Sequence, residues 1–193
     1  MSEARREWVV ELEPWVMQDG NYGDFSAGET TEFALELWSR DLAPTELRQI
    51  EAEPLDGHRY RIVAPVVWTD GDFWMIDIGV LAYVLYPQGG MEAGGWVAGV
   101  IELSIDCFHY FQQWGPHGEV PPAIYTWRIT GIREYRAPAP PANVYVPPDE
   151  LPWTVREVRE TAAWEVPDDQ VIRYELVCER LDDAPKNRLS RGW

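Results

Sequence analysis

The fold class is decided by residues 72–86, which read Asp-Phe-Trp-Met-Ile-Asp-Ile-Gly-Val-Leu-Ala-Tyr-Val-Leu-Tyr. Apolar side chains occupy both faces of this run, one face from Trp74 to Val84 and the other around Tyr83. A strand with two apolar faces is covered on both sides, as the central strand of a β core is. We therefore expect residues 72–86 to form a central core strand.

Strand-like runs flank this segment on both sides. Residues 31–38 alternate acidic and apolar side chains with the period of two that is typical of a strand with one buried face. We expect the face that carries Glu32 and Glu36 to be exposed to solvent. Further strand-like runs cover residues 8–17, 58–68, 96–105, 124–135, 153–166 and 171–181.

Composition favours one all-β domain. A chain of 193 residues with 46% apolar and 25% charged residues is long enough to bury a single globular core. Aromatic residues make up 13% of the chain, and they favour strands over helices. We predict an all-β or β-rich α+β fold, an antiparallel barrel or sandwich of about seven to nine strands with at most one or two short helices. By analogy alone, an OB-like barrel is one version of this fold.

Residues 106–114 are ambiguous between helix and strand. Cys107, Tyr110, Phe111 and Trp114 fall at helical spacing, and Gly-Pro follows directly at positions 115 and 116. Glycine followed by proline is a common end of a helix. We favour a short helix inserted between strands.

The chain divides into four predicted segments. Residues 1–136 form the main β domain, and the proline-rich residues 137–148 form a linker or surface strap. Residues 149–181 are expected to form a C-terminal β-hairpin packed on the main domain. Residues 182–193 have no periodicity and are expected to be a disordered tail.

The chain carries no targeting signal that we can identify. Residues 1–8 have no apolar core of a signal peptide, and the longest apolar run, 78–86, is shorter than the roughly 20 residues of a membrane-spanning helix. Cys107 and Cys178 are the only cysteines, which is compatible with free thiols in a reducing compartment. We expect a cytoplasmic protein without membrane association. The dominance of Arg over the single lysine, Lys186, favours a GC-rich bacterial origin.

Acidic residues are concentrated near the N-terminus. Residues 1–57 carry 14 carboxylates against 4 arginines, a net charge of −10 out of −17 for the chain. Such a field attracts basic partners and repels nucleic acid. The leading hypothesis is a non-catalytic binding protein for a basic macromolecular partner, such as an immunity protein or another inhibitor. The alternative, that the acid only keeps a Trp-rich chain dissolved, stays open. The predicted partner-binding residues are Glu11, Glu13, Glu32, Glu36, Trp38, Glu51 and Glu53.

A second hypothesis uses two Asp-Gly turns, around residues 19–24 and 70–72. In an enzyme or a small-ligand-binding barrel, these turns would converge at the barrel mouth. Short Asp side chains also stabilise turns by bonding their own backbone, which is their commoner role. The predicted ligand-binding residues are Asp19, Asp24, Asp70 and Asp72.

No motif identifies a reaction, a metal or a cofactor. Cys107 and His109 are the one local pair of nucleophile and base, and their aromatic surroundings are typical of packing. The Gly-rich residues 87–95 lack the lysine of a phosphate-binding loop. We therefore predict no catalytic residue, no metal ligand and no cofactor, and we favour a non-enzyme.

A third hypothesis is a single-strand nucleic-acid-binding, OB-like domain. Aromatic residues and arginines interleave between Tyr125 and Arg136, as they do on many surfaces that bind single strands. The net charge opposes nucleic acid. We favour ion pairing of these arginines with the acidic strands, and a nucleic-acid partner is the least favoured.

Overall fold

The computed structural model describes residues 7–70, 73–85, 87, 91–117, 120–141 and 144–190. Strands hold 49% of the residues and helices 9%, which confirms the all-β class. The strands, in chain order, are β1 (Glu7–Leu12), β2 (Thr30–Phe33), β3 (Leu35–Trp38), β4 (Ala43–Pro44), β5 (Glu51–Pro54), β6 (Arg59–Thr69), β7 (Phe73–Asp77), β8 (Leu81–Leu85), β9 (Trp96–Ile105), β10 (Tyr125–Pro138), β11 (Thr154–Val158) and β12 (Gln170–Arg180). The helical segments are α1 (Pro14–Gln18), the π-helix η1 (His109–Trp114) and the 3₁₀ turns η2 (Gly115–His117) and η3 (Pro148–Glu150).

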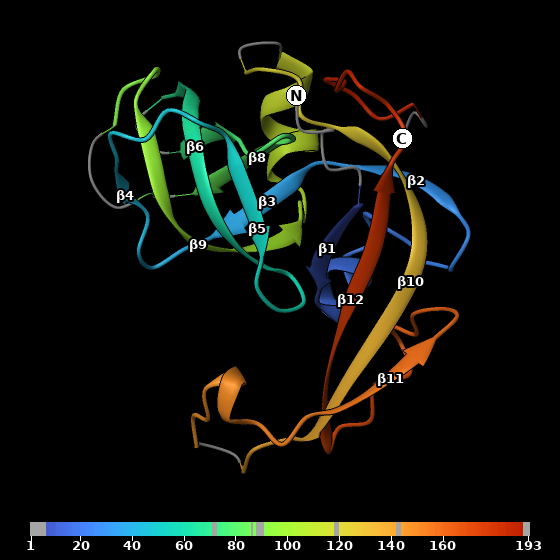
Figure 1. Ribbon diagram of the computed structural model, residues 1–193. Coiled ribbons are helices and arrows are strands. Elements are labelled where there is room, and N and C mark those ends of the chain that lie inside the picture. The colour runs from blue at the N-terminus through green and yellow to red at the C-terminus, as the bar shows by residue number, and fades with distance from the viewer. Residues whose placement is uncertain are drawn as a thin grey trace.

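Five strands close a barrel. In the order β9-β3-β8-β7-β6, each strand pairs with the next, and β6 pairs again with β9. Four of these five pairings are antiparallel, and the pairing of β3 with β8 is parallel. The inward side chains, such as Leu35, Ile62 and Ile101, are buried in one apolar cluster. Figure 1 shows this barrel beside a second group of long strands.

Residues 72–86 form a hairpin and not one strand, which corrects our expectation. β7 and β8 pair antiparallel from Phe73 to Leu85, and the chain turns between them at Gly79. Gly79 has a φ of +98°, which glycine adopts without steric cost, and its N–H donates to Asp77 Oδ1 at 2.8 Å. Apolar alternation continues through such a turn, so periodicity alone merges the two strands. With the short β4 and β5, and with residues 31–38 divided into β2 and β3, the described residues form twelve strands.

The second group of strands extends the sheet beyond the barrel. β1, β12, β10 and β11 are neighbours in that order, and β2 pairs with the start of β10. β1 joins the barrel through one parallel bridge, Glu11 to Ser104 on β9. The expected hairpin over residues 149–181 takes a different form, because β11 and β12 both pair with β10, on its opposite edges. β12 is thus an inner strand of the sheet.

Residues 182–190 of the C-terminal segment pack against the sheet, whereas we expected residues 182–193 to form a disordered tail. Lys186 forms a β-bridge with Ile124, and its Nζ donates to Glu32 Oε1 at 2.6 Å. Ser190 also donates to the Glu32 carboxylate through its Oγ at 2.7 Å. These contacts hold the segment against β2 and β10.

The helical segment after Ile105 is present, as predicted, and it covers the outside of the barrel. η1 buries Tyr110 and Phe111 in a second apolar cluster with Phe73, Tyr83 and Ala34. The Trp114 ring stacks on Phe73, with the ring centres 4.1 Å apart. Among the residues that the structure describes, no helix has the length and apolarity needed to cross a membrane.

Candidate functional site

The outer barrel face brings three of the predicted partner-binding residues together. Trp38 on β3 lies opposite Glu102 on β9, and Glu102 lies opposite Arg59 on β6. Directly opposed residues of paired strands point to the same face of a sheet. The next rows pair Arg61 with Glu53, and Val63 with Glu51. We use the name outer barrel face for the residues Trp38, Glu51, Glu53, Arg59, Arg61 and Glu102.

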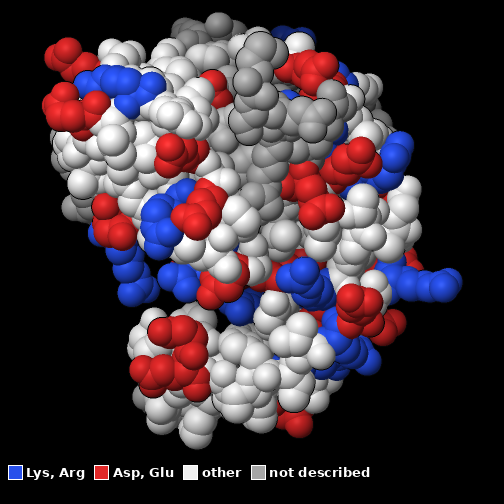
Figure 2. Space-filling view, viewed as in Figure 1, with Lys and Arg blue, Asp and Glu red and all other residues white. Residues whose placement is uncertain are grey.

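Charges on the outer barrel face are mixed. Arg61 Nη1 lies 2.6 Å from Glu53 Oε2, and Arg59 Nε lies 3.8 Å from Glu102 Oε1. Glu51 is exposed and forms no ion pair with another described residue. The Trp38 side chain is 58% exposed, although indoles usually seek burial. Figure 2 shows acidic and basic side chains interleaved on the visible side of the molecule, so no single-sign field covers it.

Glu13 is exposed as predicted, but Glu11 and Glu32 are partly buried in ion pairs. Arg173 Nη1 lies 3.2 Å from Glu11 Oε1, and Lys186 Nζ lies 2.6 Å from Glu32 Oε1. Both carboxylates tie the N-terminal strands to the C-terminal third of the chain. They are therefore poorly available to a partner.

The expectation that Glu36 faces solvent is wrong. Glu36 is 5% exposed, because η1 packs over the side of β3 that carries it. The Tyr83 hydroxyl contacts Glu36 Oε2 at 3.1 Å and also forms a short hydrogen bond with Asp106 Oδ1. We call Glu36, Tyr83 and Asp106 the acid cluster. Burial raises the pKa of Glu36 to about 7, and burial raises the pKa of Asp106 to about 6.

A second polar cluster joins the barrel to the long strands. Glu175 on β12 is 3% exposed, and its Oε1 accepts hydrogen bonds from the backbone N–H of His58 at 3.2 Å and from His58 Nδ1 at 3.0 Å. Its Oε2 accepts from Arg133 Nη1 at 3.1 Å and from the Tyr135 hydroxyl at 2.6 Å. His58 Nε2 faces Glu11 Oε2 at 3.6 Å. We call Glu11, His58, Arg133, Tyr135 and Glu175 the junction cluster.

The hydrogen bonds of the junction cluster determine the charge of Glu175. Burial alone would raise its pKa, but the bonds from His58 and Tyr135 and the charge of Arg133 lower it to about 2. Because a carboxylate only accepts hydrogen bonds, His58 Nδ1 carries the proton in the contact with Glu175. Both oxygens of Glu175 are thus occupied. The arrangement connects three segments, and none of its described members is a serine or cysteine nucleophile beside His58.

In each of the two Asp-Gly turns, an Asp side chain accepts a hydrogen bond from a nearby backbone N–H. Asp19 Oδ1 accepts from the Asn21 N–H at 3.0 Å, and Asp70 Oδ1 accepts from the Phe73 N–H at 3.2 Å. Asp24 Oδ1 accepts from Thr161 Oγ1 at 2.9 Å. The fourth predicted ligand-binding residue, Asp72, lies outside the described residues. Within the described ranges, no group of three or more His, Cys, Asp and Glu residues is arranged to hold a metal.

The aromatic and arginine segment of β10 buries one face, and arginines outside that face are held in ion pairs. Trp127 is fully buried and stacks on Phe33 with ring centres 5.3 Å apart. Arg128 pairs with Glu179 at 3.2 Å, and Arg136 pairs with Glu134. The ring stack and the ion pairs use the groups that a single strand of nucleic acid would need.

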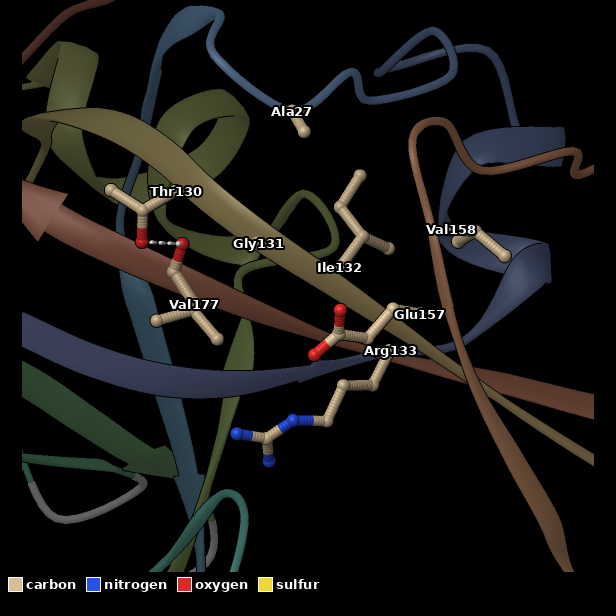
Figure 3. Close-up of a pocket in the computed structure, with 8 residues that line it drawn as sticks. All are labelled: Ala27, Thr130, Gly131, Ile132, Arg133, Glu157, Val158 and Val177. Carbon is tan, nitrogen blue, oxygen red and sulfur yellow. Dashed lines mark hydrogen bonds between the residues drawn. The ribbon is translucent and has the colours of Figure 1, made fainter.

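A hollow of about 340 Å³ lies at the edge of β10. Pairing of β10 with β2 ends at Arg128, and pairing with β11 begins only at Ile132. The gap between these two partners leaves the hollow, and Thr130 Oγ1 there donates to the Val177 carbonyl at 3.1 Å (Figure 3). Its lining residues are Ala27, Thr130, Gly131, Ile132, Arg133, Glu157, Val158 and Val177. No predicted ligand-binding residue is among them.

Sequence reasoning missed both buried polar clusters. His58 and Glu175 are 117 positions apart, and Tyr83 and Glu36 are 47 apart, so no local motif connects either pair. One sequence feature could have indicated the acid cluster: the acidic residue Asp106 stands at the end of an apolar strand, directly before a helical pattern. Comparisons of the chain with protein-family models, with curated proteins and with solved structures give no match.

Proposed function

We propose that the chain is a non-catalytic binding protein whose outer barrel face engages a basic protein partner. One observation carries this proposal: Trp38 on β3 and the pair Glu51 and Glu53 on β5 lie exposed on the same side of the neighbouring strands β3, β9, β6 and β5. Exposed tryptophan is a frequent anchor of protein interfaces. Carboxylates around it would speed association with a basic surface and orient it.

The buried polar groups support binding over catalysis. The acid cluster and the junction cluster each contain groups of catalytic type, but internal hydrogen bonds occupy them. A substrate would have to displace these bonds before it reached a reactive atom. An immunity protein or another inhibitor of a basic protein is the role that fits a rigid, acidic binding face.

The barrel holds the outer barrel face rigid. Arg59 and Arg61 neutralise part of its acid, so the partner would meet a pattern of charges and not a uniform field. Glu51 forms no ion pair with another residue that the structure describes, so its carboxylate is offered to a partner, and a partner cation could share Glu53 with Arg61. A competing protein with a different charge pattern would place like charges opposite each other, and this repulsion would give selectivity.

Capture from a lysate of the native host at low and at high salt tests the proposal. The test variant Glu51→Lys/Glu53→Lys changes the charge of the outer barrel face by +4. The control variant Asp149→Lys/Glu150→Lys makes the same change on η3, which Figure 1 places at the far end of the long strands.

We expect one basic protein to be captured by the wild type and by the control, and to be lost with the test variant and with Trp38→Ala. Capture should weaken as salt rises, because exposed charges are screened. Equal loss of capture in both charge variants would show that general acidity, and not this face, is responsible. Full capture by the test variant would also contradict the proposal.

A further inference from the structure

We propose that the acid cluster holds a bound proton that keeps η1 docked on the barrel, and that alkaline pH removes this proton and releases η1. The proposal concerns a different part of the barrel from the outer barrel face and does not depend on the binding function. It is based on hydrogen-bond geometry, on the absence of a compensating cation and on the contacts of Asp106 with η1.

The hydrogen bonds of Tyr83 require an extra proton. Its hydroxyl has one hydrogen, yet its oxygen lies 3.1 Å from Glu36 Oε2 and closer still to Asp106 Oδ1. Two ionised carboxylates can only accept, so the hydroxyl could satisfy one of them and not both. A proton on one carboxyl allows that group to donate to the Tyr83 oxygen. Both contacts are then true hydrogen bonds.

No cation in the described part of the chain bonds to the acid cluster. The titratable groups that face it are Cys107 at the end of β9, His109 and Tyr110 on η1, and Tyr22 from the loop before β2. Burial lowers the pKa of His109, which favours its neutral form. A second negative charge here would therefore stay uncompensated, which is costly in a buried site.

Asp106 links the protonation of the acid cluster to η1 through hydrogen bonds. Its Oδ1 accepts from the Tyr110 N–H at 3.0 Å, and its Oδ2 accepts from the Phe111 N–H at 3.2 Å. These bonds favour the charged form of Asp106, so Glu36 is the group that keeps the proton longest. When Glu36 also ionises, repulsion from β3 acts on the carboxylate that caps η1.

The structure of η1 suits a segment that moves as one unit. It is a six-residue π-helix, a rare form that is frequent at functional sites. Outward movement of this segment would let water reach both carboxylates, and it would unstack Trp114 from Phe73. Alkaline release would therefore change tryptophan fluorescence as well as amide exchange.

Amide hydrogen exchange of Tyr110 and Phe111 between pH 5 and pH 8, corrected for intrinsic exchange rates, tests the latch. Each pKa unit by which the docked state of η1 raises the pKa of a carboxyl group changes the equilibrium between docked and released η1 tenfold. We therefore expect the released fraction of η1 in the wild type to increase on the order of 100-fold. Glu36→Gln should flatten this increase, because its neutral amide can donate to and accept from Tyr83. Glu165→Gln, an exposed change between β11 and β12, should behave as the wild type does.

A wild-type measurement keeps the test independent of any variant. The ¹³C signal of the Glu36 carboxyl should titrate near pH 7. Titration below pH 5, opening that does not change with pH in the wild type, or an unchanged increase in Glu36→Gln would each overturn the proposal.

Discussion

Gly57 tests whether the junction cluster connects the barrel to the long strands. Gly57 has a φ of +49°, and a Cβ built on it would lie 1.9 Å from Glu175 Oε1. In Gly57→Ala, the methyl group must displace the buried carboxylate from His58. The left-handed conformation costs alanine about 1 kcal/mol. The loss of a hydrogen bond to a charged group costs about 1.5–3 kcal/mol more.

We therefore expect Gly57→Ala to lower the free energy of unfolding by about 3 kcal/mol. Urea unfolding, followed by tryptophan fluorescence and by far-UV circular dichroism, measures this loss as a lower midpoint at an unchanged slope. If the midpoint of the variant equals that of the wild type, the contact between Gly57 and Glu175 has no energetic role.

Gly28→Ala is the matched control. Gly28 has a φ of +93°, and a Cβ there would meet nothing within 4 Å. This variant carries only the conformational cost, about 1–2 kcal/mol. If Gly57→Ala costs no more than Gly28→Ala, displacement of Glu175 contributes nothing and our reasoning on the junction cluster is refuted. In a Glu175→Gln background, the excess cost of Gly57→Ala should shrink, because the displaced group no longer carries a charge.

Three other changes test the charge of Glu175, the packing of Trp127 and the contact of Lys186 with Glu32. The pKa of Glu175 is lowered to about 2, so the ionised carboxylate stabilises the fold fully above pH 4.5, and this stabilisation is lost as pH falls toward 2. In an acid titration followed by circular dichroism, Glu175→Gln should lack this loss of about 3 kcal/mol. Trp127→Ala should lower the free energy of unfolding by about 3–5 kcal/mol in urea, because it removes a fully buried indole; a loss below about 1 kcal/mol would contradict the packing. Lys186→Ala should remove the ion pair to Glu32 and leave only the Ser190 contact with it, so limited proteolysis should cut residues 182–190 faster than in the wild type while the midpoint of unfolding changes little.

Local patterns predicted many of the strands and the helical segment after Ile105, because these elements depend on neighbouring residues; they did not predict the turn at Gly79 or the helix α1 within residues 8–17. The alternation in residues 31–38 places Leu35 and Leu37 inside the barrel, as found. The helical spacing after Asp106 matches η1, and the exposure of Glu51 and Glu53 follows from their alternation with Ala52.

The burial of Glu36 and the ion pair of Glu11 depend on segments that are far apart in the sequence, so local patterns could not predict them. Glu36 has the same local pattern as an exposed strand residue, but η1 returns from positions 109–114 to cover it. Glu11 finds its partner Arg173 at a separation of 162 positions. The N-terminal acid is therefore not one continuous surface: part of it is buried, part is ion-paired, and part remains exposed on the outer barrel face.

The most direct test of the binding account is the dissociation constant of the captured partner for the two charge variants at physiological salt. We predict that Glu51→Lys/Glu53→Lys weakens binding by at least about tenfold and that Asp149→Lys/Glu150→Lys leaves it within about twofold. Equal affinities for the two variants would contradict the assignment of binding to the outer barrel face.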